Sequence, residues 1–192
     1  MGSFSADGFA PNVRSLLNGV LPPLGPGVPD ESKRPLLEAL DERALLGGRQ
    51  PADRTMAACC LSGLWLLHGF LDESHRISQG IGTCDGSYWH GVMHRREPDY
   101  WNSKYWFRRV GNHPVFEDLC REARRATAGY SLTPRAQFLA SQRTWDPFGF
   151  VDLCESAEHG DSPDHSLCVE VAHLEWQLLF DYCHRAAAGL RA

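Results

Sequence analysis

The sequence predicts an all-α fold, a single-domain bundle of about seven to nine helices. Three observations lead to this fold class. Apolar residues recur at helical spacing between capping signals, no run of alternating β-branched residues marks a strand, and no internal repeat is present. With 192 residues, 43% of them hydrophobic, the chain is long enough to bury one core. We expect one helical domain over residues 31–192, preceded by a Pro/Gly-rich strap over residues 1–30.

The first half of the chain divides at its prolines and glycines. The strap should be extended, because proline and glycine are dense in it, above all in LPPLGPGVPD. Apolar spacing then predicts a helix over residues 30–46 and a long helix over residues 54–79. A loop over residues 80–86 follows, and Ser87 can cap a helix that ends before Pro98.

The second half contains the remaining helix starts. Each is a capping residue or a residue followed by proline, which suits the first turn of a helix. These starts are Asp99 or Asn102, His113–Pro114, Thr133–Pro134, Asp146–Pro147 and Ser162–Pro163. The last of them opens the longest helix, which should end near residue 188, before Gly189.

Charge and composition exclude several classes of protein. Nineteen Lys and Arg against 24 Asp and Glu give a net charge of −5, which is unlike a general nucleic-acid binder. The longest apolar stretch, residues 61–71, is too short and too polar to cross a membrane, and no secretory signal is recognisable. Seven cysteines without a C-x-x-C motif fit a reduced environment. We expect a cytoplasmic protein that binds neither nucleic acid nor a membrane.

Ionisable residues recur along faces of the predicted helices that also carry apolar residues. Residues four and seven positions apart lie within about 60° of each other on a helix. Such sets are His68, Asp72 and His75; His90, His94 and Glu97; and, three positions apart in the last helix, Glu170 and His173. Because burying such groups unpaired costs several kcal/mol, we expect them to pair with one another or to bind a ligand.

Three interpretations of these faces stay open. In the first, a divalent metal such as iron, manganese, zinc or nickel binds, because imidazole and carboxylate are suitable ligands. Its ligands would be His90, His94 and Glu97, with Glu170 and His173 in a second set. The catalytic acid/base residues would then be His68, Asp72 and His75. In the second the groups form a structural hydrogen-bond network, and in the third they line a metal-free pocket.

Aromatic and basic residues are concentrated between residues 87 and 109. They can fill a core with Arg stacked on the rings, or cradle a planar anionic ligand, or form a platform for single-stranded nucleic acid. The acidic balance of the chain disfavours the third option, and we favour core filling with a pocket beside it. The candidate ligand-binding residues are Trp89, Arg95, Arg96 and Arg108.

The same region resembles a motif set found in uncharacterised bacterial proteins. The resemblance is carried by LHGFLDESH, SYWHGVMHRREPD and KYWFRR and covers about residues 60–120. It implies no activity, cofactor or site residue.

We therefore expect a small-molecule enzyme with an interior His/carboxylate pocket. The pocket should bind a small, anionic ligand and, in the leading interpretation, a divalent metal. The alternative is a non-catalytic ligand-binding or scaffold protein, and a homo-oligomer is compatible with either. Catalytic templates such as H-E-x-x-H and G-x-S-x-G are absent. Cys84, in the predicted loop, is a less favoured nucleophile.

Overall fold

The computed structural model describes residues 4–158 and 161–190, and this part of the chain is an all-α domain without strands. The helices are 3-10 helices η1 Ala6–Gly8 and η2 Thr127–Gly129, and α-helices α1 Pro11–Leu17, α2 Arg34–Glu38, α3 Glu42–Leu45, α4 Arg54–Leu67, α5 Leu71–Gln79, α6 Cys84–Arg96, α7 Tyr100–Val110, α8 Val115–Ala126, α9 Gln137–Ser141, α10 Pro147–Ala157 and α11 His165–Ala187. The predicted fold class is confirmed. None of the described helices combines the length and the apolar content that a membrane-spanning segment needs.

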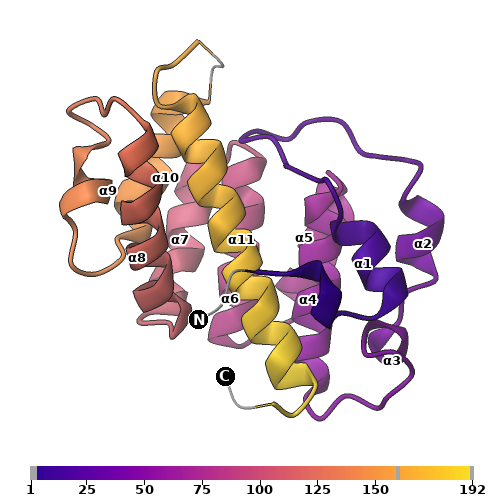
Figure 1. Cartoon of the computed structure of the whole chain (residues 1–192). Helices are drawn as coiled ribbons and strands as arrows, with labels where there is room; N and C mark the ends of the chain where they lie inside the picture. Colours follow the sequence, from indigo (N-terminus) through magenta and orange to yellow (C-terminus); the bar gives the residue numbers. More distant parts are fainter. Residues whose placement is uncertain (1–3, 159–160, 191–192) are drawn as a thin grey trace.

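The longest helix, α11, organises the bundle. It crosses the front of the molecule, with α8, α9 and α10 gathered on one side and α1, α2 and α3 on the other (Figure 1). It packs against α4 and α8, while α5, α6 and α7 follow one another as neighbouring helices. Helix α6 therefore lies between α5 and α7 and also contacts α4 in the core.

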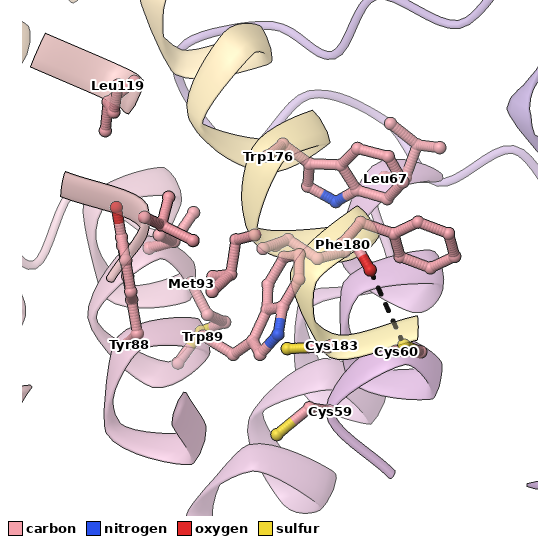
Figure 2. Packing of buried hydrophobic residues seen from close by; sticks show 14 of the residues in the cluster. Cys59, Cys60, Leu67, Tyr88, Trp89, Met93, Leu119, Trp176, Phe180 and Cys183 are labelled. Atoms are coloured by element: carbon pink, nitrogen blue, oxygen red, sulfur yellow. Dashed lines mark hydrogen bonds between the residues drawn. The ribbon is translucent and has the colours of Figure 1, made fainter. Parts of the chain in front are cut away.

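The core is centred on a close contact between α4, α6 and α11. The rings of Trp89 and Trp176 meet edge to face at 6.0 Å, and Trp176 stacks on Phe180 (Figure 2). Trp176 Nε1 donates a hydrogen bond to the carbonyl of Gly63 at 2.9 Å. A Cβ at Gly63 would lie 2.6 Å from Trp89 Cη2, so glycine is what lets α4 approach this indole.

All seven cysteines are free thiols, and all except Cys84 are buried. Cys59, Cys60 and Cys183 lie under the tryptophan pair, where Cys60 Sγ contacts the carbonyl of Phe180 at 3.9 Å (Figure 2). They fill space as small hydrophobic side chains.

The long helix expected over residues 54–79 is broken in the structure. Helix α4 ends with His68 as its C-cap, Gly69 takes the left-handed conformation with φ of +80°, and α5 starts at Leu71. A Cβ at Gly69 would lie 3.1 Å from the carbonyl oxygen of Val28, so the turn also allows the strap to cross. Because α4 and α5 have different axes, His68 and His75 do not share one helical face.

Two other boundaries differ from the prediction. The helix expected over residues 30–46 is split into α2 and α3, since the Asp41 side chain accepts from the backbone N–H groups of Arg43 and Ala44 and starts a new helix. Helix α6 begins at Cys84 and not after Ser87, because the Thr83 hydroxyl accepts from the N–H of Gly86 at 3.2 Å. The loop before α6 is correspondingly short.

The N-terminal segment is only partly extended. Residues 11–17 form α1, which buries Val13 and Leu16, while residues 18–33 contain no helix and residues 1–3 of the expected strap lie outside the described residues. Arg96 anchors the extended part by donating to the carbonyls of Gly25 at 2.8 Å and Pro26 at 3.2 Å.

Candidate metal centre

Three histidines from two neighbouring helices converge at the interface of α5 and α6. They are His75 on α5 and His90 and His94 on α6, and one ring nitrogen of each lies within 4.8 Å of the others. His90 and His94 are buried, whereas His75 is half-buried and marks the solvent side. The two α6 residues are one turn apart, and the packing of α5 on α6 supplies the third.

The tautomer of His90 follows from its hydrogen bond to Ser78. The Ser78 hydroxyl has one proton and lies 2.8 Å from the carbonyl of Ser74 and 3.2 Å from that of His75, both of which can only accept. Towards His90 the hydroxyl therefore accepts, and His90 Nδ1–H donates to it at 2.7 Å. The lone pair of His90 is thus on Nε2.

His94 is oriented in the same way by a carboxylate. Its Nδ1 lies 3.0 Å from Glu97 Oε2, one turn further along the chain. An ionised carboxylate only accepts, so Nδ1 of His94 donates and Nε2 is left with its lone pair. A carboxylate that holds one imidazole nitrogen while the other faces a metal is a common second-sphere arrangement.

The surroundings keep these imidazoles neutral. Burial lowers the pKa of His90 to about 3, and the neighbouring His94 and His75 add to this effect. Burial also lowers the pKa of His94, against the opposing influence of Glu97 and Asp99. Both rings are neutral near pH 7, which is the form of imidazole that binds a metal.

The third histidine has no such constraint. The imidazole of His75 makes no hydrogen bond to a described residue, and its ring lies 4.6 Å from that of His90 and 5.4 Å from that of His94. The indole of Trp106, on α7, packs on His90 at 4.2 Å between ring centres. The cluster is thus bounded by an aromatic side chain on the α7 side.

A second group of potential ligands, Cys84, Asp85 and His113, is chemically different. The N–H of Val115 donates to His113 Nδ1 at 3.2 Å, so the proton of His113 is on Nε2, which donates to Asp85 Oδ1 at 3.1 Å. Burial and the charge of Asp85 raise the pKa of the Cys84 thiol. Neither a free imidazole lone pair nor a thiolate is available there, which also counts against Cys84 as a nucleophile.

Arg95, expected to bind a ligand, lies in the core. Its guanidinium forms an ion pair with Glu175 on α11, in which the side chains are 2% and 0% exposed. Tyr88 donates to the other oxygen of Glu175 at 3.1 Å, and the Arg95 guanidinium lies over the ring of Phe150. The charge of Arg95 is therefore already paired.

The other expected residues lie in different places. His68 binds the carbonyl of Leu16 through Nε2 at 3.0 Å, and Arg96 holds the extended N-terminal segment, so neither joins the histidine cluster. Trp89 is fully buried in the core. Asp72 and Arg108 are exposed, on α5 and α7.

Glu170 and His173 line a separate cavity of about 440 Å³ on α11, with Leu21, Tyr130 and His165 among its other lining residues. Glu170 accepts a hydrogen bond from Tyr130 at 2.8 Å, and His173 contacts Gln177 at 2.9 Å. The second ligand set of the sequence analysis is thus not beside His90 and His94.

Comparisons of this chain with family models, with curated proteins and with solved structures found no match.

Two residues of these networks were missed in the sequence. Ser78 follows His75 by three positions and precedes His90 by twelve, and nothing in that spacing distinguishes it from other helical serines. Glu175 lies on a different side of α11 from Glu170 and His173, next to Trp176, and an acid on an apolar face was the available signal.

Proposed function

We propose that the protein is a small-molecule enzyme that holds a divalent transition metal on His75, His90 and His94. The observation that supports this most is the convergence of three imidazoles, in two of which Nδ1 is bound to Ser78 or Glu97 while no described residue is hydrogen-bonded to Nε2. In this proposal Glu97 orients the metal ligand His94, and His75 is a metal ligand and not a general base.

The donor set favours zinc or iron over manganese. Imidazole suits zinc, iron, copper and nickel, whereas manganese favours oxygen ligands. A tetrahedral metal brings its ligand nitrogens to about 3.4 Å from one another. Rotation of the rings, above all of the unconstrained His75, must therefore draw together nitrogens that now lie within 4.8 Å.

A catalytic role fits this site better than a structural one. Structural zinc sites are closed by four protein ligands, whereas catalytic sites use three and keep one position for water or substrate. The cluster has three donors, and one of them is half-buried. A metal bound there would lower the pKa of a water ligand or polarise an oxygen of the substrate.

Elemental analysis of protein purified without chelator tests the site. We expect near one equivalent of zinc or iron in the wild type, and loss of it in His90→Ala and in His75→Ala. His173→Ala is the matched control, since it removes a half-buried histidine from the separate α11 cavity and should leave the metal content unchanged. Absence of metal from the wild type after reconstitution with each ion would overturn the proposal.

The open position has its own test. Replacement by cobalt(II) should give a visible spectrum typical of four or five ligands, and azide should change that spectrum by binding at the free position. A cobalt spectrum unaffected by azide, or one lost in the His173→Ala control, would contradict a three-histidine site with an open position.

A further inference from the structure

Helix α7 presents an aromatic and cationic surface on the side opposite to its buried face, which packs on α6. Trp101 is 72% exposed and Tyr105 is 41% exposed, one turn apart, and their rings are nearly parallel at 11° with centres 6.3 Å apart. Large aromatic side chains in contact on the surface are unusual enough to indicate a binding site. Arg108 and Arg109 are exposed on the next turn. We call these four residues the α7 ledge.

The two arginines carry charge that no acid among the described residues neutralises. Neither forms an ion pair with a described residue, whereas Lys104, on another side of the same helix, is paired with Asp152. At about 100° per residue, Arg108 falls on the same face as the two stacked rings, one helical turn from Tyr105. The ledge therefore combines flat aromatic faces with unpaired positive charge.

One side chain connects the ledge to the candidate metal centre. The ring of Trp106 contacts Tyr105 edge to face at 5.5 Å and His90 at 4.2 Å. Arg109 lies over this indole, 5.2 Å from its centre. Trp106 therefore lies between the ledge and His90 and separates a molecule bound on the ledge from the histidines.

From this geometry we infer that the ledge is a binding site for a planar aromatic molecule that carries a carboxylate or phosphate group. Aromatic side chains stack on flat ring systems, and guanidinium groups bind carboxylate and phosphate through two hydrogen bonds. Binding to the ledge needs no metal and does not depend on the proposed function. Arg108 then acts as the anion-binding residue, and Trp101 and Tyr105 as the residues that select a planar ring.

Titration calorimetry with 2-naphthyl phosphate tests the inference, with 2-naphthol and inorganic phosphate as probes that have only the ring or only the anion. We expect 2-naphthyl phosphate to bind at least tenfold more tightly than either, with EDTA present as well as without it. Trp101→Ala should weaken binding by about tenfold. Arg108→Gln combined with Arg109→Gln should remove the preference for the phosphate over the naphthol.

Matched surface variants serve as controls. Leu36→Ala removes another exposed apolar side chain, on α2, and Arg135→Gln removes another exposed arginine, so neither should change binding. Equal affinity for all three probes, or equal weakening by the controls, would overturn the inference. So would a change of oligomeric state in Trp101→Ala without any probe binding, because the ledge would then be a protein interface.

The outcome also separates this inference from the proposed metal site. Binding that persists in EDTA while elemental analysis finds no metal would support the ledge and refute the proposed metal site. Metal without probe binding would retain the centre and refute the ledge.

Discussion

The buried ion pair between Arg95 and Glu175 gives the sharpest prediction on stability. Glu175→Leu removes one charge and leaves the Arg95 guanidinium buried in a core where its side chain is 2% exposed. Removing one partner of such a pair costs about 3–5 kcal/mol, because the remaining charge is uncompensated. The hydroxyl of Tyr88 loses its acceptor as well. A domain is stable by only about 5–15 kcal/mol, so this loss is a large fraction of the total.

The double variant Arg95→Met/Glu175→Leu should recover much of this loss. Two apolar side chains of similar volume replace the pair without leaving a charge behind, and such replacements are often neutral or stabilising. The free energy of unfolding should therefore fall by far less in the double variant than the sum of the decreases in Glu175→Leu and Arg95→Met, each of about 3–5 kcal/mol.

Urea unfolding followed by circular dichroism measures the free energy of unfolding of the wild type, the two single variants and the double variant. With a denaturant slope of about 2 kcal/mol per molar, the midpoint of Glu175→Leu should fall by about 1.5–2.5 M, whereas that of the double variant should fall much less. A loss below about 1 kcal/mol in Glu175→Leu, or additive losses in the double variant, would refute the reasoning.

Three further predictions concern packing, the N-terminal segment and pH. Gly63→Ala should lower the free energy of unfolding by about 1–3 kcal/mol, because its Cβ would lie 2.6 Å from Trp89. Gly82→Ala, which has open space around it, should not lower it, and the urea midpoints of the two variants measure the difference. Arg96→Met should cost about 2–4 kcal/mol and expose residues 18–33 to limited proteolysis, and unchanged cleavage would contradict the anchoring role. Burial lowers the pKa of His68, so the unfolded state binds more protons than the folded state below about pH 6.5. The free energy of unfolding should therefore fall as the pH falls from 7 towards 4. It should fall less steeply in His68→Asn.

Local signals in the sequence were sufficient for the class of fold and for most helices. Capping residues and X–Pro pairs act within one turn, so starts such as Asp146–Pro147 and the end at Gly189 could be read without knowledge of the tertiary structure. The break at Gly69 was not predicted, because apolar spacing continues across it, and the close approach of Val28, which leaves no room for a Cβ at Gly69, involves a segment far away in the chain.

The candidate site divides in the same way. Spacing alone places His90 and His94 on one face of a helix, because each residue turns by about 100°. Only tertiary packing decides which other helix contributes, since the turn at Gly69 separates His75 from His68 and directs α5 onto α6. The same packing places Glu175, and not Glu170, inside the core. The sequence by itself thus determined the helices and the residues that share a face, and the tertiary structure decided which faces meet, because the contacts between helices depend on side chains distant in the chain.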